Sequence, residues 1–75
     1  MNTQRRKVIT EIVAKLDTIQ AAIFALQEEE QEAFDNLPES LQAGEKGEAM
    51  ETAVGLLEEA VNSVGDAIDG LGEIE

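Results

Sequence analysis

The fold is decided by the stretch METAVGLLEEAVNSVGDAIDGL, residues 50–71. The segments ETAV (51–54), EEAV (58–61) and GDAI (65–68) repeat at a period of seven. The larger apolar residues recur in alternating steps of four and three, at Met50, Val54, Leu57, Val61, Val64, Ile68 and Leu71. Such a repeat places one apolar stripe along a helix. We therefore expect a helix from about residue 45 to residue 71.

A column of alanines accompanies this stripe. Ala53, Ala60 and Ala67 occupy the same place in each repeat. Small side chains let a neighbouring helix approach closely, and they widen the apolar face to three positions in seven. A face of that width is more typical of a helical bundle than of a two-stranded coiled coil.

The N-terminal part of the chain carries a second helical pattern, at about residues 3–35. No Gly or Pro interrupts this segment, and Thr3 is a suitable N-cap. Its apolar residues follow alternating steps of three and four, at Ile9, Ile12, Leu16, Ile19, Ile23 and Leu26. The pattern predicts a second helix with one continuous apolar seam.

Residues 36–44 connect the two patterns. Pro38 disfavours helical geometry at the residue before it and suits the start of a new helix, so one helical turn is expected near Pro38. A connection this short returns the chain antiparallel. Charge favours the same arrangement, because residues 1–16 carry a balance of +3 and residues 17–75 a balance of −15. The expected fold is one all-α domain over residues 1–75, an antiparallel two-helix hairpin.

Two helices alone leave part of each apolar stripe in contact with water. A chain of 75 residues without cysteine is also marginally stable by itself. We therefore expect a homo-oligomer, in which hairpins assemble into a four-helix or larger bundle. The expected oligomer seam comprises Ile12, Leu16, Ile19, Ile23, Leu57, Val61, Val64 and Ile68.

Composition argues against several classes of function. The chain has no His and no Cys, and its Ser and Thr residues have no neighbouring base that would activate them. We expect no enzymatic activity, no metal site and no cofactor. No apolar run approaches the length that crosses a membrane, and no secretory signal is apparent. A cytoplasmic location is the expectation that follows.

Charge makes binding the favoured role. Seventeen acidic residues against five basic ones give a net charge of −12. Such a body repels nucleic acid and anionic lipid, so we expect neither to bind directly, and it attracts basic surfaces. The residues expected to contact a basic protein partner are Glu28, Glu29, Glu32 and Asp35. A solvated helix face without a partner has the same appearance.

A second candidate site is the basic cluster Arg5-Arg6-Lys7. Where several N-termini meet in an oligomer, it would form an anion or nucleotide pocket. Alternatively, the cluster only pairs with the acidic C-terminal end of the hairpin. Further candidates for ligand binding combine aromatic, polar and cationic groups near the connection, at Phe34, Asn36, Pro38 and Lys46. A well-capped turn would need some of the same residues.

The connection also carries a resemblance. The segments EEQEAFDNLPESLQ (29–42) and KGEAME (46–51) are similar to short uncharacterised helical proteins of bacterial phages, prophages and conjugative elements. These proteins share the motif Phe-Asp-Asn-Leu-Pro-Glu-Ser-Leu-Gln. The resemblance implies a mobile-element origin and action inside a bacterial host cell.

Three functions are compatible with these features. The favoured one is a non-catalytic acidic protein that inhibits a host defence protein by occupying its basic surface. The second is an oligomeric sponge that sequesters a nucleotide signal between protomers. The third is a structural oligomerisation hairpin without a ligand.

Overall fold

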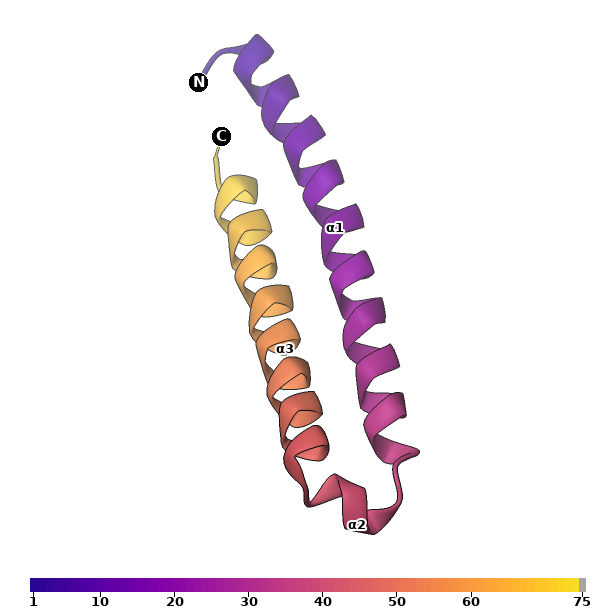
Figure 1. Cartoon of the computed structure of the whole chain (residues 1–75). Helices are drawn as coiled ribbons and strands as arrows, with labels where there is room; N and C mark the ends of the chain where they lie inside the picture. The colour runs from indigo at the N-terminus through magenta and orange to yellow at the C-terminus, as the bar shows by residue number, and fades with distance from the viewer. Residues whose placement is uncertain (75) are drawn as a thin grey trace.

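The computed structural model describes residues 1–74, and it consists of three helices (Figure 1). α1 spans Thr3–Asp35, α2 spans Glu39–Gln42 and α3 spans Glu45–Gly72. The described residues contain no strand, so this part of the chain is all-helical. The bounds of the two long helices agree to within one residue with the ranges that the apolar periodicity predicts.

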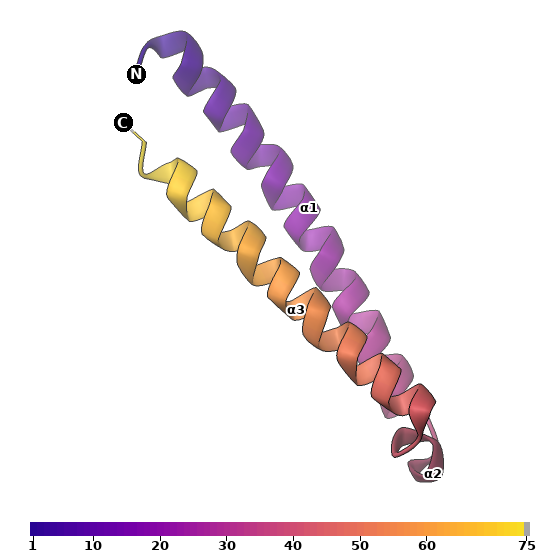
Figure 2. The ribbon, with the colours of Figure 1, turned by 60° about the vertical axis from the view of Figure 1, so that its left-hand side comes forward.

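The two long helices lie side by side and run in opposite directions (Figures 1 and 2). Both ends of the chain therefore lie at one end of the molecule, and α2 closes the other end. The result is a rod with principal extents of 58 × 14 × 12 Å. Its length allows residues far apart in the sequence to form continuous faces along the two helices.

Asn2, and not Thr3, caps the start of α1. Its side-chain Oδ1 accepts a hydrogen bond from the backbone N–H of Arg5 at 2.8 Å. The expectation that Thr3 would be the cap was wrong by one residue, because Asn is at least as good an N-cap as Thr. Gly44 is the N-cap residue of α3, and it offers no side chain to cap that helix.

Hydrogen bonds close the turn between α1 and α3. The backbone N–H groups of Leu41 and Gln42 donate to the carbonyl oxygen of Pro38 at 2.9 and 3.1 Å. The Gln42 side chain also donates from Nε2 to the carbonyl oxygens of Phe34 and Leu37, both at 3.2 Å. The Phe34 carbonyl also accepts from the backbone N–H of Leu37 at 3.0 Å, so the Gln42 side chain adds a second donor at the end of α1 and a donor to the Leu37 carbonyl in the turn.

Gly47 allows α3 to pass close to this turn. It is the one buried residue among residues 1–74. A Cβ atom built on Gly47 would lie 2.0 Å from the backbone oxygen of Gln42. Any residue other than Gly would therefore push the start of α3 away from α2.

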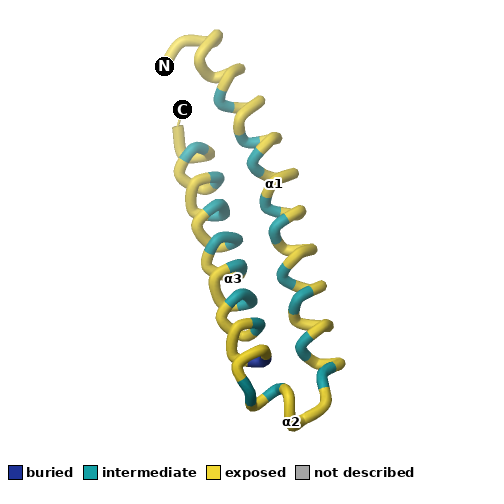
Figure 3. The backbone as a smooth tube through the Cα atoms, viewed as in Figure 1, coloured by how far each residue is buried: buried dark blue, intermediate teal, exposed yellow. Residues whose placement is uncertain are grey.

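Half-buried residues form a contact stripe along the sides of α1 and α3 that face each other (Figure 3). In α3 the stripe contains all seven large apolar residues that the periodicity of residues 50–71 selects. In α1 it comprises Ile9, Val13, Leu16, Gln20, Ile23, Gln27, Glu30 and Phe34. No apolar side chain in the described part of the chain is fully buried, so two helices alone build no closed core.

Only part of the apolar seam of α1 contacts α3. Leu16 and Ile23 face α3, but Ile12, Ile19 and Leu26 lie beside the contact stripe and are 41, 49 and 54% exposed. The physical reason is that α1 is apolar at three positions in seven, whereas contact with one helix covers only about two. The third apolar column is left on the flank.

Gln20 occupies a place in the stripe that the apolar pattern does not predict. Its Nε2 donates to the carbonyl oxygen of Val61 in α3 at 3.0 Å. A Cβ atom at Gly65 would lie 2.9 Å from the same nitrogen, so the missing side chain makes room for the amide. This directional bond sets the register of α1 against α3. It also favours packing of α1 on α3 through the side of α1 that carries Gln20, and not through the side that carries Ile19.

Candidate binding surface

The two faces on either side of the contact stripe differ in charge. In each helix, the residues one position after a stripe residue lie on the same side of the pair. Thr10 follows Ile9, Gly72 follows Leu71, and both line one pocket. This side is the acidic face. It carries the carboxylates Asp17, Glu28, Asp35, Glu48, Glu51, Glu58 and Asp69. The only cation at the corresponding positions is Lys7, so the face attracts basic groups.

A shallow groove of about 360 Å³ lies on the α1 part of this face. The residues that line it are Phe24, Gln27, Glu28, Gln31, Glu32 and Asp35. Gln31 Nε2 donates to Asp35 Oδ1 at 2.9 Å, which orients that carboxylate. The structure thus brings together three of the four acidic residues that the sequence nominates. The fourth, Glu29, lies on the opposite flank of α1.

Phe24 is the centre of the acidic face. It lines this groove and also a neighbouring one of about 350 Å³, formed with Asp17, Gln20, Ala21 and Val61. The ring is 47% exposed, although it is one of only two aromatic side chains in the protein. An exposed ring among carboxylates suits the side chain of Arg or Lys, which can stack on the ring while its charge faces the acids.

Phe24 is not among the candidate residues that the sequence nominates. The signal that could have found it is its spacing, because Phe24 lies seven residues after Asp17 and seven before Gln31. A helical stripe of polar residues with one aromatic ring at its centre differs from an apolar core stripe.

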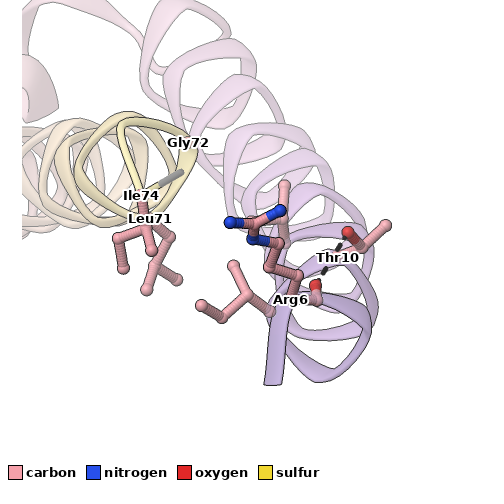
Figure 4. A pocket seen from close by; sticks show the side chains of 7 residues that line it. Arg6, Thr10, Leu71, Gly72 and Ile74 are labelled. Atoms are coloured by element: carbon pink, nitrogen blue, oxygen red, sulfur yellow. Dashed lines mark hydrogen bonds between the residues drawn. The ribbon is translucent and has the colours of Figure 1, made fainter. Parts of the chain in front are cut away.

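The basic cluster at the N-terminus does not converge on one site. Arg6 lines a pocket of about 440 Å³ at the end of the rod where both termini lie (Figure 4). The other residues around this pocket are Ile9, Thr10, Val13, Leu71, Gly72 and Ile74. Thr10 Oγ1 donates to the Arg6 carbonyl at 3.1 Å. Arg5 and Lys7 fall on opposite flanks of α1, so a single chain offers this pocket one cation in mostly apolar surroundings.

The candidate ligand-binding residues of the connection have structural roles in the turn. The carbonyl of Phe34 accepts from Gln42, Asn36 is the C-cap of α1, and Pro38 precedes α2 as its N-cap. Lys46 lies exposed in the first turn of α3. These positions account for the turn without requiring a ligand.

Two further observations concern the described residues as a whole. Neither long helix contains, within residues 1–74, a stretch apolar enough to cross a membrane. Over the same residues, no three carboxylates approach one another closely enough to hold a metal ion.

No protein family, curated protein or solved structure matches the chain.

Proposed function

We propose that the protein is a non-catalytic binding protein whose acidic face docks on a basic surface of another protein. The observation that carries this proposal is the exposed ring of Phe24 at the centre of an acidic face. Binding energy in protein interfaces concentrates in a few central side chains, commonly aromatic, that are surrounded by a polar rim. Phe24 supplies the centre, and Asp17, Glu28 and Asp35 supply the rim on α1.

The charge of the face indicates the class of partner. Nucleic acid and anionic membranes repel a surface of this sign, whereas a groove that normally binds nucleic acid attracts it. The resemblance to short phage proteins favours a host defence protein with such a groove as the target. In this role the carboxylates stand in for phosphates, and inhibition is stoichiometric.

The assembly we propose is the one expected from the sequence. The helix pair acts as an antiparallel hairpin, and hairpins associate into a four-helix or larger bundle. The third column of apolar residues on α1 supports this assembly. It also supports the structural alternative, an oligomerisation hairpin with no ligand, which predicts that no partner binds the acidic face.

A pair of neighbouring residues provides a matched test of the proposal. Glu58 directly follows the stripe residue Leu57 and belongs to the acidic face, whereas Glu59 lies one further step of about 100° around α3, on the side opposite the contact stripe. Both are exposed, and Glu→Lys changes the net charge equally at either position. Affinity capture from a bacterial lysate, at low and high salt, is compared for wild type, Glu58→Lys, Glu59→Lys and Phe24→Ala.

We expect wild type and Glu59→Lys to retain a partner at low salt and to lose it at high salt, because screening weakens charge-driven association. Glu58→Lys and Phe24→Ala should lose the partner at both. Equal behaviour of the two Glu variants would show that net charge, and not this face, attracts the protein. Recovery of a nucleotide with the purified protein would favour the sponge instead.

A further inference from the structure

The face opposite the acidic one is apolar along its length. Residues on this flank of α1 include Ile12, Ile19 and Leu26, which are 41, 49 and 54% exposed, and Leu56 on the same side of α3 is 60% exposed. On α3 the residues one position before Val54, Val61 and Ile68 are alanines, of which Ala53 and Ala60 are half-buried and Ala67 is exposed. We call this surface the apolar face.

Charge is distributed unevenly between this face and the rest of the molecule. Glu29 is its one acidic residue among residues 1–74, whereas Arg5, Lys15 and Lys46 all belong to it. Three of the five cations of the protein therefore lie on the face that has almost no carboxylates. Any other broad contact between two copies would bring acidic surfaces together, and this face alone allows them to approach.

We infer that the apolar face binds a second copy of this chain, related by a two-fold axis that places the two turns at opposite ends of the assembly. The inference rests on the proposed bundle and specifies its interface. The size of the face agrees with this occupant. The 58 × 14 Å outline of the rod leaves room for a standard stable interface, in which each partner buries roughly 800 Å².

The position of the charges selects the orientation of the second copy. Lys15 and Glu29 lie on the same flank of α1, seven residues to either side of Ala22. When α1 packs antiparallel on α1 of the second copy near Ala22, Lys15 of each chain lies within about one helical turn of Glu29 of the other. With both turns at one end, α1 would face α3 of the second copy, which has no acid on this flank.

The register of α1 against α3 supports the same two-fold axis. The Gln20–Val61 hydrogen bond sets Ala22 of α1 beside the middle of α3, close to Ala60. Both helices thus have a small side chain at the centre of the face. An axis through this level lets α1 meet α1 and α3 meet α3 without displacing a bulky group.

Mass measurement by sedimentation equilibrium tests the interface. Wild type should be dimeric, and Ile19→Glu should be monomeric and helical, since about half of Ile19 is exposed in a single chain. Ala21→Glu adds a charge on the acidic face next to the same turn of α1 and should remain dimeric. Lys15→Glu should weaken the dimer by at least tenfold, and adding Glu29→Lys to it should restore most of the affinity.

The outcomes separate this inference from the proposals on which it rests. A monomeric wild type overturns both the bundle and its interface. A dimer that survives Ile19→Glu overturns the interface and leaves the bundle standing. Spin labels at Ser40→Cys in the turn should be separated by most of the length of the rod, and labels in contact would overturn the orientation. Partner capture by Glu58→Lys reports on the acidic face independently.

Discussion

Replacing Gly47 by Ala should disrupt the turn, whereas the same substitution at Gly55 should stabilise the protein. Ala is favoured over Gly by about 1 kcal/mol in a helix interior. A Cβ atom at Gly55 would meet nothing within 4 Å apart from its chain neighbours and the backbone of its own helix, so this variant should gain that amount. For a chain of this size, the gain corresponds to a rise in melting temperature of about 4–8 °C.

At Gly47 the added atom would lie 2.0, 2.5 and 2.7 Å from the backbone O, C and Cα atoms of Gln42. Because these are backbone atoms, α2 must move as a unit, and overpacking of this kind costs about 1–3 kcal/mol. We therefore expect Gly47→Ala to melt below Gly55→Ala by at least about 4–8 °C.

Thermal melting followed by far-UV circular dichroism measures both variants. All samples need the same protein concentration, because the melting temperature of an oligomer depends on it. A Gly47→Ala protein that melts as high as Gly55→Ala would refute the close approach of α3 to the turn. It would also remove the structural basis for the position of α2.

Three further results follow from the same contacts. Gln42→Glu should lower stability by about 1 kcal/mol, because a carboxylate cannot donate to the carbonyls of Phe34 and Leu37, and chemical denaturation measures the loss. Gly65→Ala should stabilise the protein more in a Gln20→Ala background than in wild type, since the added Cβ meets only the Gln20 amide; a double-mutant cycle checks this coupling. Added salt should raise the melting temperature, because it screens the self-repulsion of a chain with net charge −12, and it should weaken partner capture. A melting temperature that falls with added salt, or partner capture that strengthens with it, would contradict these charge effects.

Apolar periodicity predicts the helices of this protein well because each pattern is long and nearly unbroken. The step of four and three from Met50 to Leu71 coincides with the half-buried residues of α3. Pro38 marks the turn for an equally local reason, since its ring restricts the residue before it.

The side of α1 that meets α3 could not be predicted in this way. Its apolar face is three columns wide, and periodicity does not say which two columns a neighbour covers. The choice depends on Gln20, whose bond to Val61 spans 41 residues of sequence. Such a contact is visible only once both helices have been placed.

The candidate site could be predicted from the sequence only in part, where helical spacing alone brings residues together. Glu28, Glu32 and Asp35 share one groove because their spacing keeps them on one side of α1. Glu29 is separated from them by one step along the helix, which is a rotation of about 100°. The sequence alone does not show that the carboxylates of α3 share a face with those of α1, because this depends on how the two helices pair. The central position of Phe24 on that face depends on the same pairing.

The central claim is that one face of the rod is covered by a second copy while the opposite face remains free for a partner. The adjacent residues Ala21 and Ala22 lie on the acidic and the apolar face, and the chain has no natural cysteine to interfere with labelling. Thiol-labelling rates of Ala21→Cys and Ala22→Cys are measured as the protein is diluted through its dissociation range. We predict that labelling at position 22 speeds up on dilution while labelling at position 21 does not change. Rates at both positions that are independent of concentration would contradict the account.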